Sequence, residues 1–191
     1  MKKYMIYTML AVLLASGAAY SQRFEKGQIG IELRGGLANG YFFGKDQNPA
    51  FYVGAAVNLY TSKDSRWVMG SEFYHKSYDY QDKSIKLGQF TAEAGHYFPI
   101  IFDCRQNIVI SAGGSAVAGY ERLNWGKLDL YDGAILLNKD KFIYGAAASL
   151  EVEFFPSDKF ILFVNGRERL LWNAVDKFNG QVGIGARLII R

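Results

Sequence analysis

The chain has 191 residues with a formal net charge of +4, and 50% of its residues are hydrophobic. This length suits one domain or one small barrel, and the weak positive charge is not the signature of a nucleic-acid-binding protein. The 21 glycines, 13 tyrosines and 14 phenylalanines against 3 prolines favour many strands and turns. The single cysteine, Cys104, excludes an internal disulfide, so packing and strand pairing must stabilise the fold.

The N-terminus has the pattern of an export signal. Two lysines precede an apolar run from Met5 to Ala15, and the small residues that end at Ser21 predict cleavage before Gln22. The run is shorter than the roughly 20 apolar residues that a transmembrane anchor needs. We therefore predict a signal peptide over residues 1–21 and a single β-barrel domain over residues 22–191.

Beyond this signal, apolar residues alternate with polar or smaller ones, which is the period of a β-strand. Each run is roughly 10 to 15 residues long, enough to cross a bilayer when tilted. The predicted strands are residues 29–37, 51–59, 66–78, 86–98, 107–121, 142–155, 159–171 and 179–190.

The connections alternate in length along the chain. We interpret the segments at 62–65, 99–106 and 156–158 as turns, and they alternate with segments at 39–50, 79–85, 122–141 and 172–178, which we interpret as loops. Outer-membrane barrels have this asymmetry because short turns face the periplasm and longer loops face outward. The sequence therefore predicts an all-β fold, an eight-stranded antiparallel up-and-down outer-membrane-type β-barrel.

The two faces of each predicted strand differ in polarity. In the last strand Val182, Ile184 and Leu188 share one face, whereas Arg187 lies on the other. In a membrane barrel the apolar face points outward and the polar face lines the lumen. We interpret the polar faces, with a bulge near Gly166 in the seventh strand, as a lumenal ion-pair network that plugs the barrel. Its predicted members are Glu32, Arg34, Glu72, Glu93, Glu151, Glu153, Arg167, Arg169 and Arg187.

Aromatic residues near the predicted strand ends are candidates for the interfacial girdles of a membrane barrel. The alternative is that they are ordinary strand formers. The candidates are Tyr41, Phe42, Tyr52, Tyr60, Trp67, Tyr74, Tyr97, Phe98, Tyr120, Phe142, Tyr144, Phe154 and Trp172.

Catalytic and metal-binding patterns are missing from the sequence. His75 and His96 are the only histidines, and we expect them on neighbouring strands with opposite facing, without further ligands at metal-binding spacing. The sequence has no Gly-x-Ser-x-Gly elbow and no phosphate-binding loop. We therefore predict a protein that is not an enzyme and that holds no cofactor or metal.

Several short sequence motifs resemble those of a known family. They are residues 30–36 (GIELRGG), 89–95 (QFTAEAG), 113–121 (GGSAVAGYE), 124–126 (NWG), 130–134 (LYDGA) and 166–169 (GRER). With these motifs in this order, the chain resembles the TraO family of conjugative-transposon transfer proteins over nearly its whole length. The resemblance implies a part in conjugative DNA transfer, with other transfer proteins as partners, and it carries over no catalytic or binding residues.

The segment 122–141 is the longest predicted loop, and long loops on a rigid scaffold often carry function. Asn124, Trp125, Tyr131 and Asp132 are therefore the candidate partner-contact residues, and a self-packed cap on the barrel is the alternative. We expect a non-enzymatic component of a mating apparatus in the outer membrane of a Gram-negative bacterium, in contact with lipid and without direct nucleic-acid binding. The alternative is a soluble periplasmic lipocalin-like barrel that binds a small ligand, which the charged inward faces disfavour.

Overall fold

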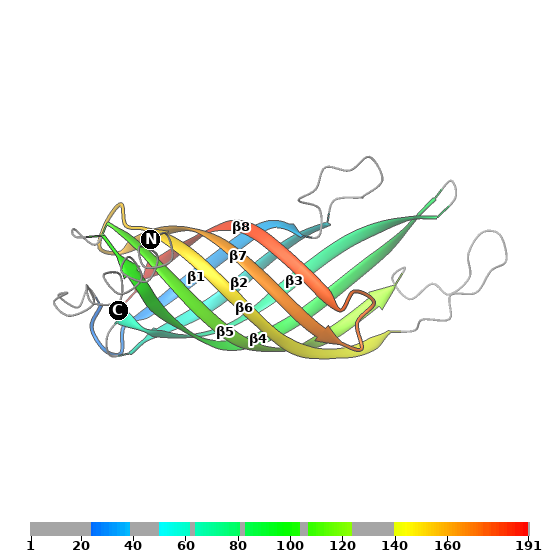
Figure 1. Cartoon of the computed structure of the whole chain (residues 1–191), viewed down its shortest axis with the longest axis horizontal. Helices are drawn as coiled ribbons and strands as arrows, with labels where there is room; N and C mark the ends of the chain where they lie inside the picture. Colours follow the sequence, from blue (N-terminus) through cyan, green and yellow to red (C-terminus); the bar gives the residue numbers. More distant parts are fainter. Residues whose placement is uncertain are drawn as a thin grey trace, which may run out of the picture.

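The computed structural model describes residues 24–38, 50–61, 64–80, 83–103, 107–123 and 140–190. Eight antiparallel strands close into a barrel in which each strand pairs with its neighbours in sequence and β8 returns to β1 (Figure 1). They are β1 (Ile29–Ala38), β2 (Ala50–Tyr60), β3 (Arg66–Tyr80), β4 (Lys83–Phe102), β5 (Ile108–Leu123), β6 (Lys141–Phe154), β7 (Phe160–Trp172) and β8 (Phe178–Ile189). The predicted eight-stranded up-and-down barrel is confirmed. The signal peptide prediction lies outside the described residues.

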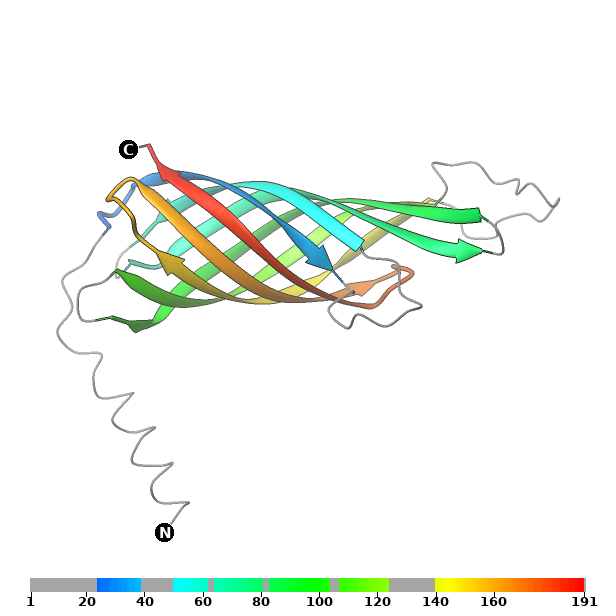
Figure 2. The ribbon, with the colours of Figure 1, turned by 90° about the horizontal axis from the view of Figure 1, so that it is seen from above.

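The β3–β4 hairpin is longer than the sequence predicted. Strand β3 continues to Tyr80 and β4 begins at Lys83, so most of the predicted 79–85 loop is paired strand. The hairpin projects beyond the neighbouring strands at the end of the barrel opposite both ends of the described chain, an end that we call the loop end (Figure 2). Tyr80 and Ile85 are strand-forming residues past residue 78, which is consistent with the extension.

One strand carries an irregularity, and it is not where the sequence suggested. The register of β4 against β5 shifts between Pro99 and Ile101, where proline has no backbone N–H to donate to the ladder. The bulge predicted near Gly166 is wrong, because β7 pairs with β6 and β8 without any shift. Arg167 and Arg169 reach the interior through the unbroken alternation of β7.

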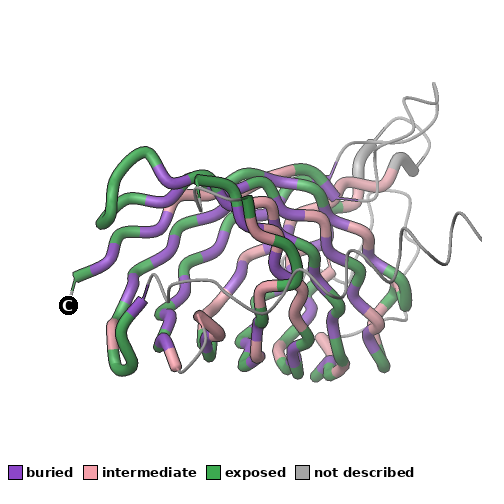
Figure 3. Tube along the Cα trace, turned by 60° about the vertical axis from the view of Figure 1, so that its left-hand side comes forward, coloured by how far each residue is buried: buried purple, intermediate pink, exposed green. Residues whose placement is uncertain are grey.

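Burial alternates along the strands, as the tube in Figure 3 shows. In β2 the pattern is strict, with every second residue buried and the others exposed. The outward positions carry large apolar side chains, such as Leu33, Phe90 and Ile184, which are 63%, 60% and 69% exposed. Within the described part of the chain, no helix is long and apolar enough to cross a membrane.

Apolar side chains close both ends of the lumen, the space that the strands enclose. At the end that holds both ends of the described chain, Phe24 stacks on Tyr60 with ring centroids 4.0 Å apart, in a cluster with Val109, Phe155, Ile161 and Ile189. At the other end the clusters include Tyr52, Tyr74 and Leu87, and Val117, Ile143 and Leu171. The charged side chains lie between these two apolar layers.

Candidate functional site

The candidate site is the charged middle of the lumen. Five arginines and five glutamates lie there, each at most 8% exposed, and their formal charges cancel. They come from β1 (Glu32, Arg34), β3 (Arg66, Glu72), β4 (Glu93), β6 (Glu151, Glu153), β7 (Arg167, Arg169) and β8 (Arg187).

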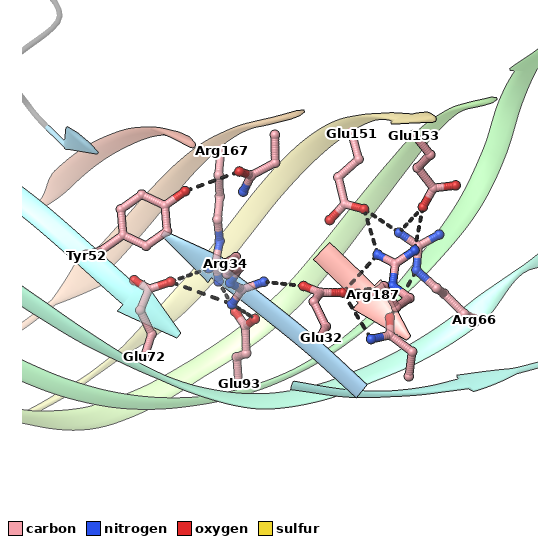
Figure 4. A network of polar contacts seen from close by, with 12 residues as sticks. Glu32, Arg34, Tyr52, Arg66, Glu72, Glu93, Glu151, Glu153, Arg167 and Arg187 are labelled. Carbon is pink, nitrogen blue, oxygen red and sulfur yellow. Dashed lines mark hydrogen bonds and ion pairs between the residues drawn. The ribbon is translucent and has the colours of Figure 1, made fainter. Parts of the chain in front are cut away.

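The half of this network nearer the chain ends centres on Arg187. Its Nη2 lies 2.8 Å from Glu32 Oε2 and 3.1 Å from Glu151 Oε2, and its Nη1 lies 2.7 Å from Glu153 Oε1. Arg66 Nη2 lies 2.9 Å from Glu153 Oε1 and also pairs with Glu151 (Figure 4). Two guanidiniums thus face three carboxylates, which gives this half an excess negative charge.

The other half centres on Glu72. Its Oε1 lies 2.7 Å from Arg169 Nη1, and its Oε2 lies 3.0 Å from Arg167 Nη1. Glu93 pairs with both Arg34 and Arg167. Three guanidiniums face two carboxylates here, so this half has an excess positive charge.

One ion pair joins the two halves. Arg34 Nη1 lies 3.5 Å from Glu32 Oε1, so the positive half supplies a cation to the negative half (Figure 4). Burying one ionised group without a partner costs several kcal/mol, and the penalty is offset only when opposite charges lie close together. The lumen tolerates ten charges because the two halves compensate each other.

Neutral polar side chains add hydrogen bonds around the ions. Asn58 donates to Glu32 Oε2 at 3.0 Å and accepts from Arg66 Nε at 3.1 Å. Gln181 donates to Glu72 Oε1 at 2.7 Å. These amides fix the positions of the carboxylates without changing the balance of charge.

Inward glycines make room for bulky lumenal rings. A Cβ at Gly183 would lie 2.2 Å from the hydroxyl oxygen of Tyr52, and one at Gly185 would lie 2.2 Å from Cζ of Phe163. The Tyr52 hydroxyl in turn donates to Asn165 Oδ1 at 3.2 Å. Long polar and aromatic side chains therefore fill the interior, so this lumen is packed and not an open channel.

The nine network residues named from the sequence all lie together in the lumen, and sequence reasoning missed Arg66. Its position could have been found, because residue 66 has the same parity as Glu72 along β3. Asn124, Trp125, Tyr131 and Asp132, the candidate partner-contact residues, lie outside the described residues.

Some of the expected girdle aromatics face inward. Tyr52, Tyr60, Tyr74 and Tyr97 are buried in the lumen, so their assignment to a girdle is wrong. Their hydroxyl groups suit a polar interior, which explains why tyrosine rather than phenylalanine occupies these positions. The outward-facing candidates are Trp67, Phe98, Tyr120, Phe142, Tyr144, Phe154 and Trp172. Tyr41 and Phe42 lie outside the described residues.

The two histidines both lie on the outer face, so their expected opposite facing is wrong. The ring centroids of His75 and Phe51 lie 5.2 Å apart, and those of His96 and Trp67 lie 4.9 Å apart. In the described ranges, no group of three His, Cys, Asp or Glu side chains is arranged to hold a metal ion.

A closed eight-stranded meander with a charged interior and an apolar exterior is an outer-membrane-type β-barrel. The sequence model of the family described as conjugative transposon protein TraO matches residues 26–190, and the chain belongs to that family. None of the curated proteins matches this sequence.

Solved structures show the same fold at low sequence identity. Neisserial surface protein A is 15% identical with a TM-score of 0.59, over 85% of this chain and 96% of that one. Ail of Yersinia pestis, in complex with the heparin analogue sucrose octasulfate, is 12% identical with a TM-score of 0.55, over 87% and 100%. The N-terminal β-barrel domain of Pseudomonas aeruginosa OprF is 9% identical with a TM-score of 0.52, over 86% and 98%.

Proposed function

We propose that this protein is a non-enzymatic structural and interaction component of a conjugative DNA-transfer apparatus, held in the outer membrane of a Gram-negative bacterium by its barrel. The observation that carries the proposal is the match of the conjugative-transposon family over residues 26–190, which span the whole barrel. The family match therefore covers every strand of the barrel.

The outer surface supports a membrane location. Large apolar side chains are exposed on all eight strands, as at Ile31, Val53, Met69, Phe98 and Leu150. In water a surface of this kind would favour aggregation, whereas in a bilayer it faces lipid. A lipocalin-like barrel would need the reverse arrangement, with an apolar lumen for its ligand.

The packed lumen supports a scaffolding role over a conducting one. Charged side chains fill its middle and apolar clusters close both ends. Because the lumen is packed, a strand of DNA has no space inside this single barrel. For the same reason, partner proteins can contact only the loops, the turns or the outer wall. The 122–141 loop, with Trp125 and Tyr131, stays our candidate for such contacts.

Transfer assays in a deletion strain test the proposal. We expect deletion of the gene to abolish conjugative transfer and the wild-type gene to restore it, with the protein in the outer-membrane fraction and its gel mobility changed by boiling in detergent. Recovery as a freely soluble periplasmic protein, or unchanged transfer after deletion, would contradict the proposal.

The loop has its own matched test. Replacing Trp125 and Tyr131 together by alanine should lower transfer while leaving the heat-dependent gel shift intact, because both positions lie outside the eight strands. Replacing Phe51 by leucine on the outer face of β2 is the control, and we expect it to change neither measurement.

A further inference from the structure

Glu168 is an exposed carboxylate on the outer wall of the barrel. It lies between Arg167 and Arg169 in the GRER motif (residues 166–169), but the alternation of β7 directs those two side chains inward and that of Glu168 outward. Among the described residues, no hydrogen bond or ion pair satisfies its carboxylate. The lumenal network therefore leaves this charge unexplained.

Glu168 lies well within the span of β7. Along the outer face of the strand, Trp172 lies four residues beyond it and Phe160 lies eight residues before it. On the adjacent strand it pairs with Ala148, midway between the exposed rings of Phe142 and Phe154. In the proposed membrane location, these aromatic side chains place the carboxylate at the depth of the hydrocarbon, where ionisable groups are rare and mark functional sites.

On the side that faces β5, the row of the wall that contains Glu168 consists of small residues. Ala148 separates it from Gly114 on β5, and Ala116 pairs with Ala146 in the next row. We call Gly114, Ala116, Ala146, Ala148, Gly166 and Glu168 the lateral patch. Each of them faces outward and is at least partly exposed. The small side chains of the lateral patch let the backbone of a neighbouring molecule approach closely.

The fold does not require glycine at two positions of this patch. A Cβ at Gly166 would meet nothing within 4 Å, and one at Gly114 would meet only the Ala147 carbonyl oxygen, at 3.9 Å. By contrast, a Cβ at Gly145 would lie 2.0 Å from the Leu170 carbonyl oxygen. Glycine weakens a strand, and where the fold does not demand it, it marks a place where another backbone comes close.

We propose that the lateral patch binds a membrane-spanning segment of another protein, one that carries a lysine or arginine at the depth of Glu168. The inference rests on the proposed membrane location. A cation at this depth would satisfy the carboxylate, and the missing side chains at Gly114 and Gly166 would let the two backbones pack.

A second copy of this chain is a poorer occupant. Two copies joined by the same patch would bring two Glu168 carboxylates together, and like charges repel. Within the described strands, the outward-facing cations are Lys86 and Arg122, both near the loop end of the barrel. Neither offers a cation at the depth of Glu168.

Photocrosslinking in cells that carry the whole transfer apparatus tests this inference. A benzoylphenylalanine in place of Leu150, which pairs with Gly166 and is 49% exposed, should form an adduct with one partner protein. The same probe in place of Val53, on the outer face of β2, is the control and should not capture that partner. The adducted segment, identified by mass spectrometry, should be membrane-spanning and contain lysine or arginine.

Charge and shape variants make the test specific. Glu168→Gln should lower the adduct yield about tenfold, since a charge-assisted bond is lost, whereas Glu168→Asp should retain it. Glu168→Lys combined with glutamate in place of the partner's cation should restore it. Gly166→Val should also abolish the adduct while the barrel folds normally, because its side chain enters space that is open in the barrel alone. Ala55→Val on β2 is the matched control.

Three outcomes would overturn the inference: an adduct yield that Glu168→Gln leaves unchanged, adducts with lipid only, or adducts between two copies of this chain. Outer-membrane fractionation and the heat-dependent gel shift are measured on each variant. A barrel that inserts normally but fails these crosslinking tests refutes the lateral patch and leaves the proposed function intact, whereas a barrel that is not in the membrane refutes both.

Discussion

The inner and outer faces of the barrel follow different rules although they share the same strands. Arg187 and Leu188 are adjacent in sequence, yet the first is 0% exposed and the second 52% exposed. Inside, each of the ten network charges is stabilised by named opposite charges within a few ångströms. Outside, an apolar side chain is stabilised by the medium around the barrel and not by a particular partner. Changes inside should therefore act through specific pairs, and changes outside through the surroundings.

The largest effect is expected for Arg187→Leu. The change leaves Glu32, Glu151 and Glu153 facing one another without their shared cation, so it should lower the free energy of unfolding by about 3–5 kcal/mol. Urea unfolding in phospholipid vesicles measures it. Leu188→Val is the outer-face control and should cost less than about 1.5 kcal/mol. Equal losses for the two variants would contradict the assignment of faces.

A charge added to the outer wall should show that lipid surrounds it. Leu33 is 63% exposed in the middle of β1. Leu33→Arg should lower the free energy of unfolding in vesicles by roughly 2–4 kcal/mol because arginine must enter the hydrocarbon. On a surface facing water, the same change would fall within about 0.5 kcal/mol. A result near zero in vesicles would argue against the membrane location.

Loss of the aromatic closure near the chain ends should act mostly locally. Phe24→Ala removes the stack on Tyr60 at one mouth of the lumen, and we expect the lost ring pairing to cost about 1 kcal/mol beyond the lost burial. The hydrogen bond from the Gly27 N–H to the Tyr60 carbonyl should open more often. Hydrogen exchange should show faster exchange at Gly27 and no change at the centre of β7. Uniformly faster exchange throughout the barrel would mean that Phe24 supports the whole fold.

The smallest effect is expected for a charge pair at the loop end. Lys76 Nζ lies 2.8 Å from Asp176 Oδ2, but these side chains are 17% and 25% exposed. Lys76→Met should cost only about 0.5 kcal/mol. High salt should remove the difference between wild type and Lys76→Met, whereas the loss in Arg187→Leu should persist because salt screens buried charges much less than exposed ones. A salt-insensitive Lys76 pair would mean that it belongs with the buried network.

Alternation by itself was sufficient to assign the strands and most of their faces. In β8 the sequence places Val182, Ile184 and Leu188 outward and Arg187 inward, and burial agrees. It was less reliable for residues that suit both media. Tyrosine fits a polar lumen as well as a membrane interface, so nearness to a strand end did not determine where Tyr52 and Tyr97 point.

Local sequence also could not locate irregularities. Arg167 and Arg169 were expected to need a bulge near Gly166, but β7 is regular and the shift lies at Pro99 in β4. A bulge depends on how two strands align, and one strand's sequence does not contain that alignment.

The sequence determined the number of strands, which of their faces are polar, and the family. It could do so because side chains alternate locally along a strand and because the motifs of the family are short stretches of sequence. The tertiary structure decided which charges meet. Glu32 and Arg187 are 155 residues apart, and their 2.8 Å contact exists only because β8 closes onto β1. Closure also brings the ten network charges together in a balanced interior, whereas Glu168 faces outward through the alternation of β7. Which opposite charges become neighbours is a property of strand register around the whole barrel, and no single segment encodes it.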